Sequence, residues 1–387
     1  MVSNPELIGL LVGAGSVGKH HARVMSRRYH QLIVVDPSST VEAWMKENLK
    51  PGDVYYNNLD SAISAIGDRA ENVTAVIANL APDHCSTFNR LADCGIRKIV
   101  CEKPMSDSIA LATQMSNRAK SDGIRLTVGF PRRFTLAASH VNIAANEDLN
   151  GPPSAIAVHG GAKCLVTFGS HIVDFAIELF GSQPLRLAAV GNAASINPRG
   201  STLGYWGGAA SWEFSNNRYL TMMFTNESSV QSSATIYAPT GMFEMAVNGR
   251  ITMFKRNADE VERDPRVTRV GDVDKQGVEI VSALEASSIA LMLDEIESQN
   301  YLTYSGDQLV GSMEAMFGAF AVAGEAHRTL STIPGQGSRL RPSEGLLLRG
   351  VHHGGKRGVH QVTQLVARVD VVVATVEVAI VLDGESA

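Results

Sequence analysis

Three glycines near the N-terminus have the spacing of a phosphate-binding turn. They belong to the hexamer Gly13-Ala14-Gly15-Ser16-Val17-Gly18, which follows an apolar segment and precedes a stretch with helical spacing that we expect to start near Ser16. In a strand–turn–helix unit the first glycine permits the tight turn, the second lets the backbone approach a pyrophosphate, and the third lets the helix pack on the strand. The N-terminus of the helix attracts the anion. The pattern predicts a dinucleotide site that involves Gly13, Gly15, Ser16, Val17 and Gly18.

A carboxylate follows this turn at the spacing that such a site needs. The apolar segment Leu32–Val35 predicts a second strand, and Asp36 comes next, eighteen residues after Gly18. An acid at this position accepts hydrogen bonds from the adenine ribose hydroxyls and repels a 2′-phosphate. We therefore expect NAD as the cofactor, with NADP left open because Pro37-Ser38-Ser39 follows. A glycine-rich turn with an ordinary aspartate at a strand end is the alternative.

A lysine and a histidine farther along the chain could supply charge and a proton. Lys103 and Pro104 follow a predicted strand over residues 97–101, whose carboxyl end should face the nicotinamide. An ammonium group there can hold the substrate oxygen and stabilise developing negative charge. His171 lies at a predicted helix start near Ser170, and an imidazole with a pKa of about 6.5 suits reversible transfer of a hydroxyl proton. The alternatives are an exposed lysine before a proline and an interior histidine.

The elements that must position these residues alternate in the first third of the chain. Short β-rich segments predict strands over 7–12, 32–36, 73–79, 97–101 and 125–129, with a further short strand at Val54–Tyr56. Helical spacing or composition marks His20–Arg28, Leu59–Ile66, His84–Cys94 and Ser106–Ser121. The alternation predicts an α/β Rossmann domain over residues 1–130, a doubly wound parallel sheet with its ligand crevice beyond the carboxyl ends of the strands.

The rhythm of the sequence changes after residue 150. Segments of β type predict an α+β domain over residues 131–335 with a large, open, mostly antiparallel sheet; they span 154–159, 186–192, 211–214, 219–225, 229–237, 242–247 and 250–254. Helices are expected near 281–298 and 307–329. Residues 336–387 form an atypical tail, rich first in Arg and His and then in Val. Its valine-rich run should pair with another segment or subunit, or be an extension without a role in the chemistry, which we prefer.

Several of these segments, in this order, resemble motifs of one enzyme family. They are Gly13–Gly18, Asn79–His84, Glu102-Lys103-Pro104, Gly129–Phe134 and Gly169–Asp174. Together they resemble the glucose-fructose oxidoreductase / inositol dehydrogenase / rhizopine catabolism (Gfo/Idh/MocA) family, over about residues 5–335. The resemblance implies hydride transfer at a carbinol or ketone carbon, with Lys103 polarising the oxygen and His171 shuttling the proton. It also implies a cofactor site that includes Asn79, Pro82, His84, Glu102 and Lys103, and a homodimer or homotetramer built by packing the open sheets face to face.

One position departs from the family pattern. Many dehydrogenases of the family have an aspartate four residues before the histidine, where this chain has Thr167. A threonine can form a hydrogen bond with a substrate hydroxyl, but it cannot act as a carboxylate base or raise the pKa of the histidine by its charge. Asp174 and Glu178 share a helix face with His171, so Asp174 could orient the imidazole or cap the local network.

Two further groups could contact a substrate. Tyr205 and Trp206, within Gly204–Gly208, have flat faces that suit a sugar ring, and Arg199 is nearby in sequence; a hairpin tip or a subunit contact would explain the same residues. Arg132 and Arg133 could anchor an anionic substrate or form a salt bridge at the hinge between the domains.

Composition and charge exclude several classes of protein. The 34 Lys+Arg and 39 Asp+Glu residues give a net charge of −5, which leaves no global basic field for nucleic acid. The first apolar segment is too short to cross a bilayer, and we predict neither an export signal nor a membrane span. The four cysteines, Cys85, Cys94, Cys101 and Cys164, form no close C-x-x-C pair, so we expect free thiols, a cytoplasmic location and no metal site.

The sequence therefore predicts an NAD(P)-dependent oxidoreductase that acts on a small polyhydroxylated substrate, namely a sugar, a sugar derivative or a cyclitol. Two alternatives remain. One is a non-catalytic, dinucleotide-sensing regulatory protein, which Thr167 and the unusual tail favour. The other is a lyase, epimerase or glycosidase of the same fold that regenerates NAD in each cycle.

Overall fold

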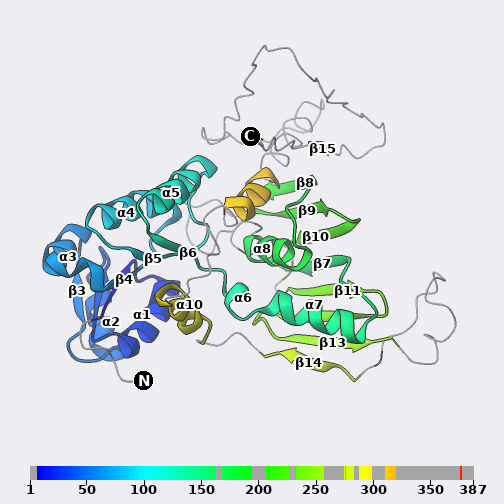
Figure 1. Ribbon diagram of the computed structural model, residues 1–387, viewed down its shortest axis with the longest axis horizontal. Coiled ribbons are helices and arrows are strands. Elements are labelled where there is room, and N and C mark those ends of the chain that lie inside the picture. The colour runs from blue at the N-terminus through cyan, green and yellow to red at the C-terminus, as the bar shows by residue number, and fades with distance from the viewer. Residues whose placement is uncertain are drawn as a thin grey trace, which may run out of the picture.

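Two sheets lie side by side in the computed structural model of this chain (Figure 1). The structure describes residues 7–161, 165, 168–193, 206–225, 228, 230, 232–256, 274, 276–282, 287–298 and 310–319, and the backbone of 375–376. Among these described residues, no helix is both long enough and apolar enough to span a membrane.

The first sheet is parallel throughout and confirms the predicted doubly wound arrangement. Its strands are β1 (Ile8–Val12), β2 (Gln31–Val35), β3 (Val54–Tyr56), β4 (Val73–Ile77), β5 (Lys98–Cys101) and β6 (Arg125–Val128), in the order β3-β2-β1-β4-β5-β6. Every residue of β1 and β4 is buried, as expected for strands covered on both faces. The chain order reverses between β1 and β4, and ligands of such sheets bind beyond the strand ends at this point.

Helices flank this sheet and begin just after the strand ends. They are α1 (Ser16–Arg28), α2 (Thr40–Asn48), α3 (Leu59–Ile66), α4 (Ala81–Asp93) and α5 (Ile109–Ser121). The sequence analysis missed α2, a short helix with only Val41 and Met45 buried. So small a buried face gives a weak periodic signal.

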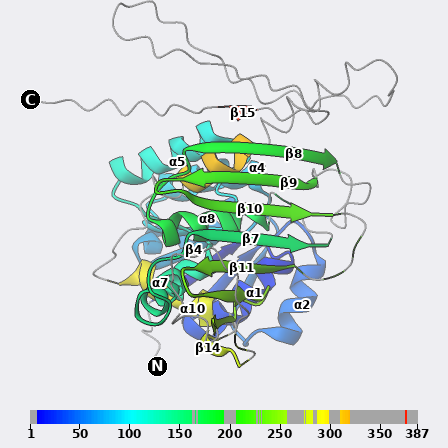
Figure 2. The same cartoon turned by 90° about the vertical axis from the view of Figure 1, so that its right-hand side faces the viewer.

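The second sheet is large and mostly antiparallel, as predicted. Its strands are β7 (Ala155–Gly160), β8 (Arg186–Ala193), β9 (Trp206–Phe214), β10 (Arg218–Phe224), β11 (Ser233–Ala238), β12 (Gly241–Met245), β13 (Ile251–Lys255), β14 (Val278–Val281) and β15 (Thr375–Val376). Their order is β14-β13-β12-β11-β7-β10-β9-β8-β15, and only β7 and β10 pair in parallel. Helices α7 (Ala137–Asp148) and α8 (Gly169–Phe180) cover one face, while Figure 2 looks onto the other, where no described helix lies in front of the strands.

The second domain contains elements that the sequence analysis did not predict. Helix α7 was not predicted, because its buried face consists mainly of alanines that carry little periodic signal. Strand β14 lies where the start of a helix was expected, and the helix itself, α10 (Ser287–Glu297), begins six residues later. Residues 310–319 of the predicted helix 307–329 are helical, and its remainder lies outside the described residues. In the tail, β15 pairs with β8 at the sheet edge through Thr375 and Val376.

Two segments from the C-terminal half return to the first domain. Met292, Leu293 and Ile296 of α10 belong to the core that includes β1, β2 and β5 of the first sheet. The guanidinium of Arg28 in α1 donates to Asp294 at 2.6 Å and to Glu297 at 2.5 Å, both in α10. The helix of residues 310–319 contributes to the cores of both domains. The boundary predicted at residue 130 thus separates the sheets, but later helices pack across it.

Candidate active site

The glycine turn has the backbone geometry that its sequence predicts. Gly13 has φ +95°, and a side chain there would overlap the backbone of Asn79, while a Cβ on Gly18 would overlap the carbonyl oxygen of Gly13. A Cβ on Gly15 would meet no atom within 4 Å. Gly13 and Gly18 are therefore needed for packing within the protein, whereas the space in front of Gly15 is open to a ligand.

The start of α1 presents its first amide groups to that space. Gly15, Ser16 and Val17 are exposed, no side chain caps the helix, and its first turn contains no acidic residue. Asp36 lies beside the turn: its Oδ2 accepts from the amide of Ala14 at 2.8 Å, and its Oδ1 accepts from the amide of Ser38 at 2.9 Å. The N-terminus of α1 has no protein anion and lies next to the fixed carboxylate of Asp36. This arrangement suits a dinucleotide, because the amides can bind its phosphates and the carboxylate can accept hydrogen bonds from its ribose.

The loop after β4 is tied to the turn after β5 by a buried histidine. Nε2 of His84 lies 3.1 Å from the carbonyl oxygen of Asn79, and Nδ1 lies 3.0 Å from that of Pro104. Burial lowers the pKa of His84, although the hydrogen bonds to these carbonyls oppose the effect. The ring is 1% exposed, so its contacts in this structure hold the two loops together. Pro82, in contrast, is exposed in the first turn of α4.

A second histidine, which the sequence analysis did not identify, lies beside the predicted catalytic lysine. Nε2 of His21 in α1 is 2.6 Å from Oε1 of Glu102, and Oε2 of Glu102 accepts from the amide of Lys103 at 3.3 Å. Gly129 leaves room for this carboxylate, because a Cβ there would come within 2.8 Å of Oε1. The available signal was the position of His21 three residues after Gly18, on the buried face of α1.

These contacts keep the carboxyl group of Glu102 ionised. Burial alone would raise its pKa, but the hydrogen bond with His21 and the charges of His21 and Lys103 outweigh burial and lower the pKa below its ordinary value. The turn that carries Lys103 is thereby anchored to α1, next to the glycine turn.

The structure brings the segments of Lys103 and His171 together. Pro104 and Ser170, their neighbours in sequence, line one hollow with Phe130 and the helix of residues 310–319. The ring of His171 packs edge-on against Phe130, with centroids 5.8 Å apart. Burial, and then the positive charges of Lys103 and Arg132, hold the pKa of His171 well below its ordinary value. The turn after β5 and the start of α8 therefore lie on the same hollow, next to Phe130.

Asp174 has other partners than the predicted one. Its oxygens accept from Nε and Nη2 of Arg133 at 2.7–3.0 Å, and Oδ1 also accepts from Oγ of Ser312 at 2.7 Å. Arg133 therefore forms the salt bridge at the hinge that was one of its two interpretations. Asp174 thus belongs to a local network, the second of its two interpretations, and not to a pair with His171, whose Nδ1 is buried and forms no hydrogen bond with the described residues. Burial raises the pKa of the neighbouring Glu178 to about 7.

Of the remaining predicted substrate residues, some lie within the described part of the chain and others do not. Arg132 is 5% exposed, and its charge acts on His171. Trp206 begins β9. Thr167 and Tyr205 lie outside the described residues.

Comparison with known proteins agrees with this arrangement. Residues 9–130 match the GFO_IDH_MocA family model, which is described as an oxidoreductase family with an NAD-binding Rossmann fold. The first domain thus matches the NAD-binding Rossmann domain of the Gfo/Idh/MocA oxidoreductase family. A relative from Bacillus subtilis (strain 168), the uncharacterized oxidoreductase YrbE, is 25% identical over 219 residues, or 51% of this chain. The match spans 61% of the length of that relative.

Solved structures share the fold of both domains of this chain. An oxidoreductase from Agrobacterium radiobacter, solved in complex with NAD+, L-tartaric acid and magnesium, superposes with a TM-score of 0.63 at 14% identity, covering 82% of this chain and 96% of its own. A UDP-N-acetylglucosamine 3-dehydrogenase, GnnA from Acidithiobacillus ferrooxidans, superposes with a TM-score of 0.62 at 14% identity, covering 81% of this chain and 97% of its own. At these identities the likeness shows the fold.

Proposed function

We propose that this protein is an NAD(P)-dependent dehydrogenase or reductase that transfers hydride between nicotinamide and a C–OH or C=O carbon of a sugar, sugar derivative or cyclitol. The observation that carries the proposal is that Pro104 and Ser170, the sequence neighbours of Lys103 and His171, line the same hollow. The positive charge of Lys103 also contributes to lowering the pKa of His171. Both lie beyond the carboxyl ends of the parallel strands, where the glycine turn also opens.

The residues of the glycine turn fit a dinucleotide. Gly13, Gly15 and Gly18 would hold the pyrophosphate against the amides of α1, and Asp36 would bind the adenine ribose, which favours NAD over NADP. When bound, the nicotinamide exchanges a hydride with the substrate carbon.

Lys103 is proposed to hold the substrate oxygen. Its ammonium group would donate a hydrogen bond to that oxygen and stabilise the negative charge that develops there as the hydride leaves. Glu102 and His21 act as positioning residues, because they fix the backbone from which the Lys103 side chain projects.

His171 is proposed to take the hydroxyl proton during oxidation and to return it during reduction. Its lowered pKa keeps the imidazole neutral at neutral pH, which is the form that accepts a proton. Since Nδ1 is buried, Nε2 is the ring atom left to meet the substrate oxygen.

The experiment separates cofactor binding from turnover. NADH fluorescence should change when the purified protein is added, and Gly15→Trp should abolish that change without unfolding the protein, because the new side chain meets open space. Lys103→Met should lower kcat by about 10²–10⁴-fold, measured at 340 nm on a panel of sugars, cyclitols and keto sugars, while NADH affinity stays within about threefold. The exposed Lys46→Met, at a surface pair with Glu42, is the matched control.

Three outcomes would contradict parts of the proposal. Turnover of Lys103→Met at the wild-type rate would remove the lysine from the chemistry. Tight NADH binding without turnover on the whole panel would favour the regulatory alternative. Product formation without net change in NADH would favour the NAD-recycling alternative.

The open face of the second sheet supports the proposal of a homodimer or homotetramer. Tyr219 of β10 and Tyr237 of β11 flank Ala155 of β7 in register on this face, and both tyrosines are more than 40% exposed. Met223, also on β10, is 52% exposed. Apolar groups gathered on an uncovered sheet face favour packing against a second copy. The free thiols of Cys85, Cys94 and Cys101 agree with the proposed cytoplasmic location.

A further inference from the structure

Arg132 is a buried cation that no described carboxylate neutralises directly. It lies in α6 (Pro131–Phe134), the short helix through which the chain passes from the first domain to the second, and is 5% exposed. Its Nε donates to the sulfur of Met245 at 3.4 Å, a weak acceptor, and its terminal nitrogens form no hydrogen bond or ion pair with the described residues. Burying a guanidinium in this way is costly, because the charge loses water and gains no anion.

The neighbouring Arg133 is a buried arginine whose charge is paired with a carboxylate. Arg133, next in sequence and equally buried, is paired through two nitrogens with both oxygens of Asp174. Asp174 also accepts from Ser312, so its hydrogen-bonding capacity is committed. The charge of Asp174 raises the pKa of Arg132, but burial has the larger effect and lowers that pKa to about 10. Arg132 remains protonated at neutral pH.

The Arg132 side chain borders a hollow next to the proposed base. Phe168 and Ile172, which flank His171 at the start of α8, line it together with Ser232 and Met245. The hydroxyl of Ser232 is buried and has no partner among the described residues. The hollow is narrow, with no room for a water molecule between the side chains as they stand. Met245 is the flexible wall that can shift to admit a ligand group.

Two positive charges, those of Lys103 and Arg132, act on the pKa of His171. Among the described carboxylates nearby, Glu102 contacts His21 and interacts with Lys103, Asp174 pairs with Arg133, and Glu178 also interacts with Arg133. None of them forms an ion pair with Arg132. An anionic group bound at Arg132 would supply the direct partner that this buried guanidinium lacks, which a neutral polyol would not.

We propose that Arg132, with the hydroxyl of Ser232, binds a carboxylate of the substrate, so that the substrate class narrows to polyhydroxylated acids such as sugar acids. This inference rests on the proposed hydride transfer. The planar guanidinium matches a carboxylate with two parallel N–H···O bonds, and a serine hydroxyl can donate a third.

Carboxylate binding would also tune the base. An anion on Arg132 offsets one of the two charges that depress the pKa of His171, so that pKa rises toward its ordinary value when the acid is bound. The imidazole then becomes a stronger proton acceptor only in the complex with the correct substrate.

The test compares acids with their neutral counterparts on the NAD-loaded protein. The pairs are D-glucuronate and D-glucose, D-galacturonate and D-galactose, and D-gluconate and sorbitol. Binding of each compound is measured by the fluorescence of the NADH-loaded protein, and its oxidation by the NAD-loaded protein is measured at 340 nm. We expect at least one acid to be preferred over its neutral partner, and Arg132→Met to reduce the preference for the acid, in binding and in KM, by about 100-fold. Arg132→Lys should retain part of the preference, and the exposed Arg90→Met should behave as the wild type.

A stability measurement separates this role from a structural one. Because Arg132 lacks a direct partner, Arg132→Met should leave the melting temperature unchanged or raise it, whereas removal of a structural ion pair lowers it. No preference for any acid, or a lower melting temperature with unchanged acid binding, would overturn the proposal. If Lys103→Met leaves turnover intact while Arg132→Met removes acid binding, the catalytic proposal fails and the carboxylate site stands. If neutral substrates are oxidised as well as acids and Lys103→Met abolishes turnover, the carboxylate site fails and the catalytic proposal stands.

Discussion

Asp174→Asn should weaken the junction between the two domains. The Asp174 carboxylate is 1% exposed and accepts from Arg133, which is 3% exposed, and from Ser312. These three residues lie in α8, in α6 and in the helix of residues 310–319, so one carboxylate joins three elements. An asparagine of the same shape keeps the packing but leaves the buried guanidinium without its counter-charge.

The expected magnitude follows from this burial. Removing one partner of a buried pair costs about 3–5 kcal/mol, because the remaining charge stays desolvated. At roughly 2 °C per kcal/mol in a chain of this size, the melting temperature should fall by at least about 6 °C. A double variant, Arg133→Met with Asp174→Leu, should recover much of the loss, because no unpaired charge remains.

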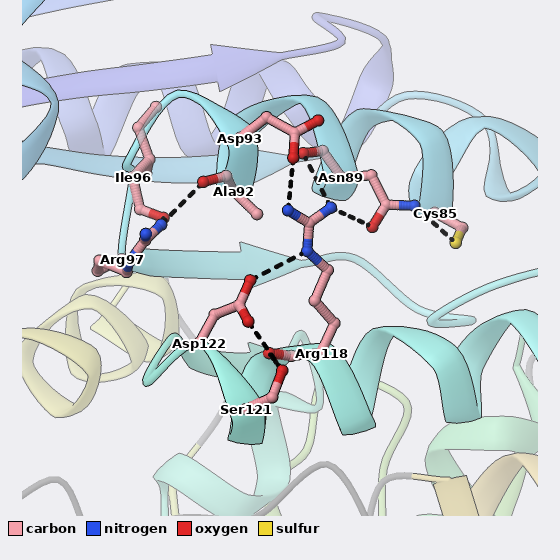
Figure 3. Close-up of polar contacts among 9 residues, drawn as sticks. All are labelled: Cys85, Asn89, Ala92, Asp93, Ile96, Arg97, Arg118, Ser121 and Asp122. Carbon is pink, nitrogen blue, oxygen red and sulfur yellow. Dashed lines mark hydrogen bonds and ion pairs between the residues drawn. The ribbon is translucent and has the colours of Figure 1, made fainter.

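The ion-pair network of Arg118 provides a matched control. Figure 3 shows Arg118 of α5 reaching Asp93 and Asn89 of α4, and Asp122 just beyond its own helix. The side chains of Asp93 and Asp122 are 57% and 34% exposed. Water already solvates such groups, so Arg118→Met should cost no more than about 1 kcal/mol.

The assay is thermal and urea unfolding followed by circular dichroism, with all variants at one protein concentration. Equal losses for Asp174→Asn and Arg118→Met would refute the argument that burial determines the contribution of the pair. A double variant less stable than Asp174→Asn alone would refute the explanation by an unpaired charge.

Two further predictions concern His171 and the open sheet face. Burial and the charges of Lys103 and Arg132 depress the pKa of His171, so the unfolded chain takes up a proton below about pH 6.5 that the folded protein does not. The free energy of unfolding should fall with decreasing pH below that point, by at most about 1.4 kcal/mol per pH unit. In urea titrations His171→Asn should reduce this dependence on pH. The same pH dependence for the variant and the wild type would contradict the assignment. Sedimentation should give a dimer or tetramer that Tyr219→Glu with Met223→Glu dissociates; a monomeric wild type would rule the interface out.

The glycine turn and the residues at the strand ends could be predicted from sequence because their determinants are local. Gly13, Gly15 and Gly18 act through backbone geometry within a few residues, and a strand end followed by Asp36 or Lys103 marks the same sheet edge in each case. Alternating apolar segments likewise predicted all six strands of the first sheet. The short helix α2 and the alanine-faced helix α7 were not predicted, because a small buried face leaves little periodicity in the sequence.

The sequence did not predict which buried charged groups pair with one another. Neighbouring arginines at 132 and 133 look equivalent in sequence, yet one pairs with Asp174 and the other borders the hollow near His171. His21 and Glu102 are 81 residues apart and meet only because α1 and the end of β5 lie at the same sheet edge. Such pairings depend on where helices cross, which spacing along one segment does not encode.

By itself, the sequence determined the parallel sheet, the glycine turn and the types of residue at the strand ends, since each depends on short-range sterics and periodic burial. Only the tertiary structure decided which cation is paired, which histidine anchors the lysine turn and which lies against Phe130. The physical reason is that desolvation and Coulomb interactions act between groups that folding brings together from distant positions. Their strength depends on burial and separation rather than on order along the chain.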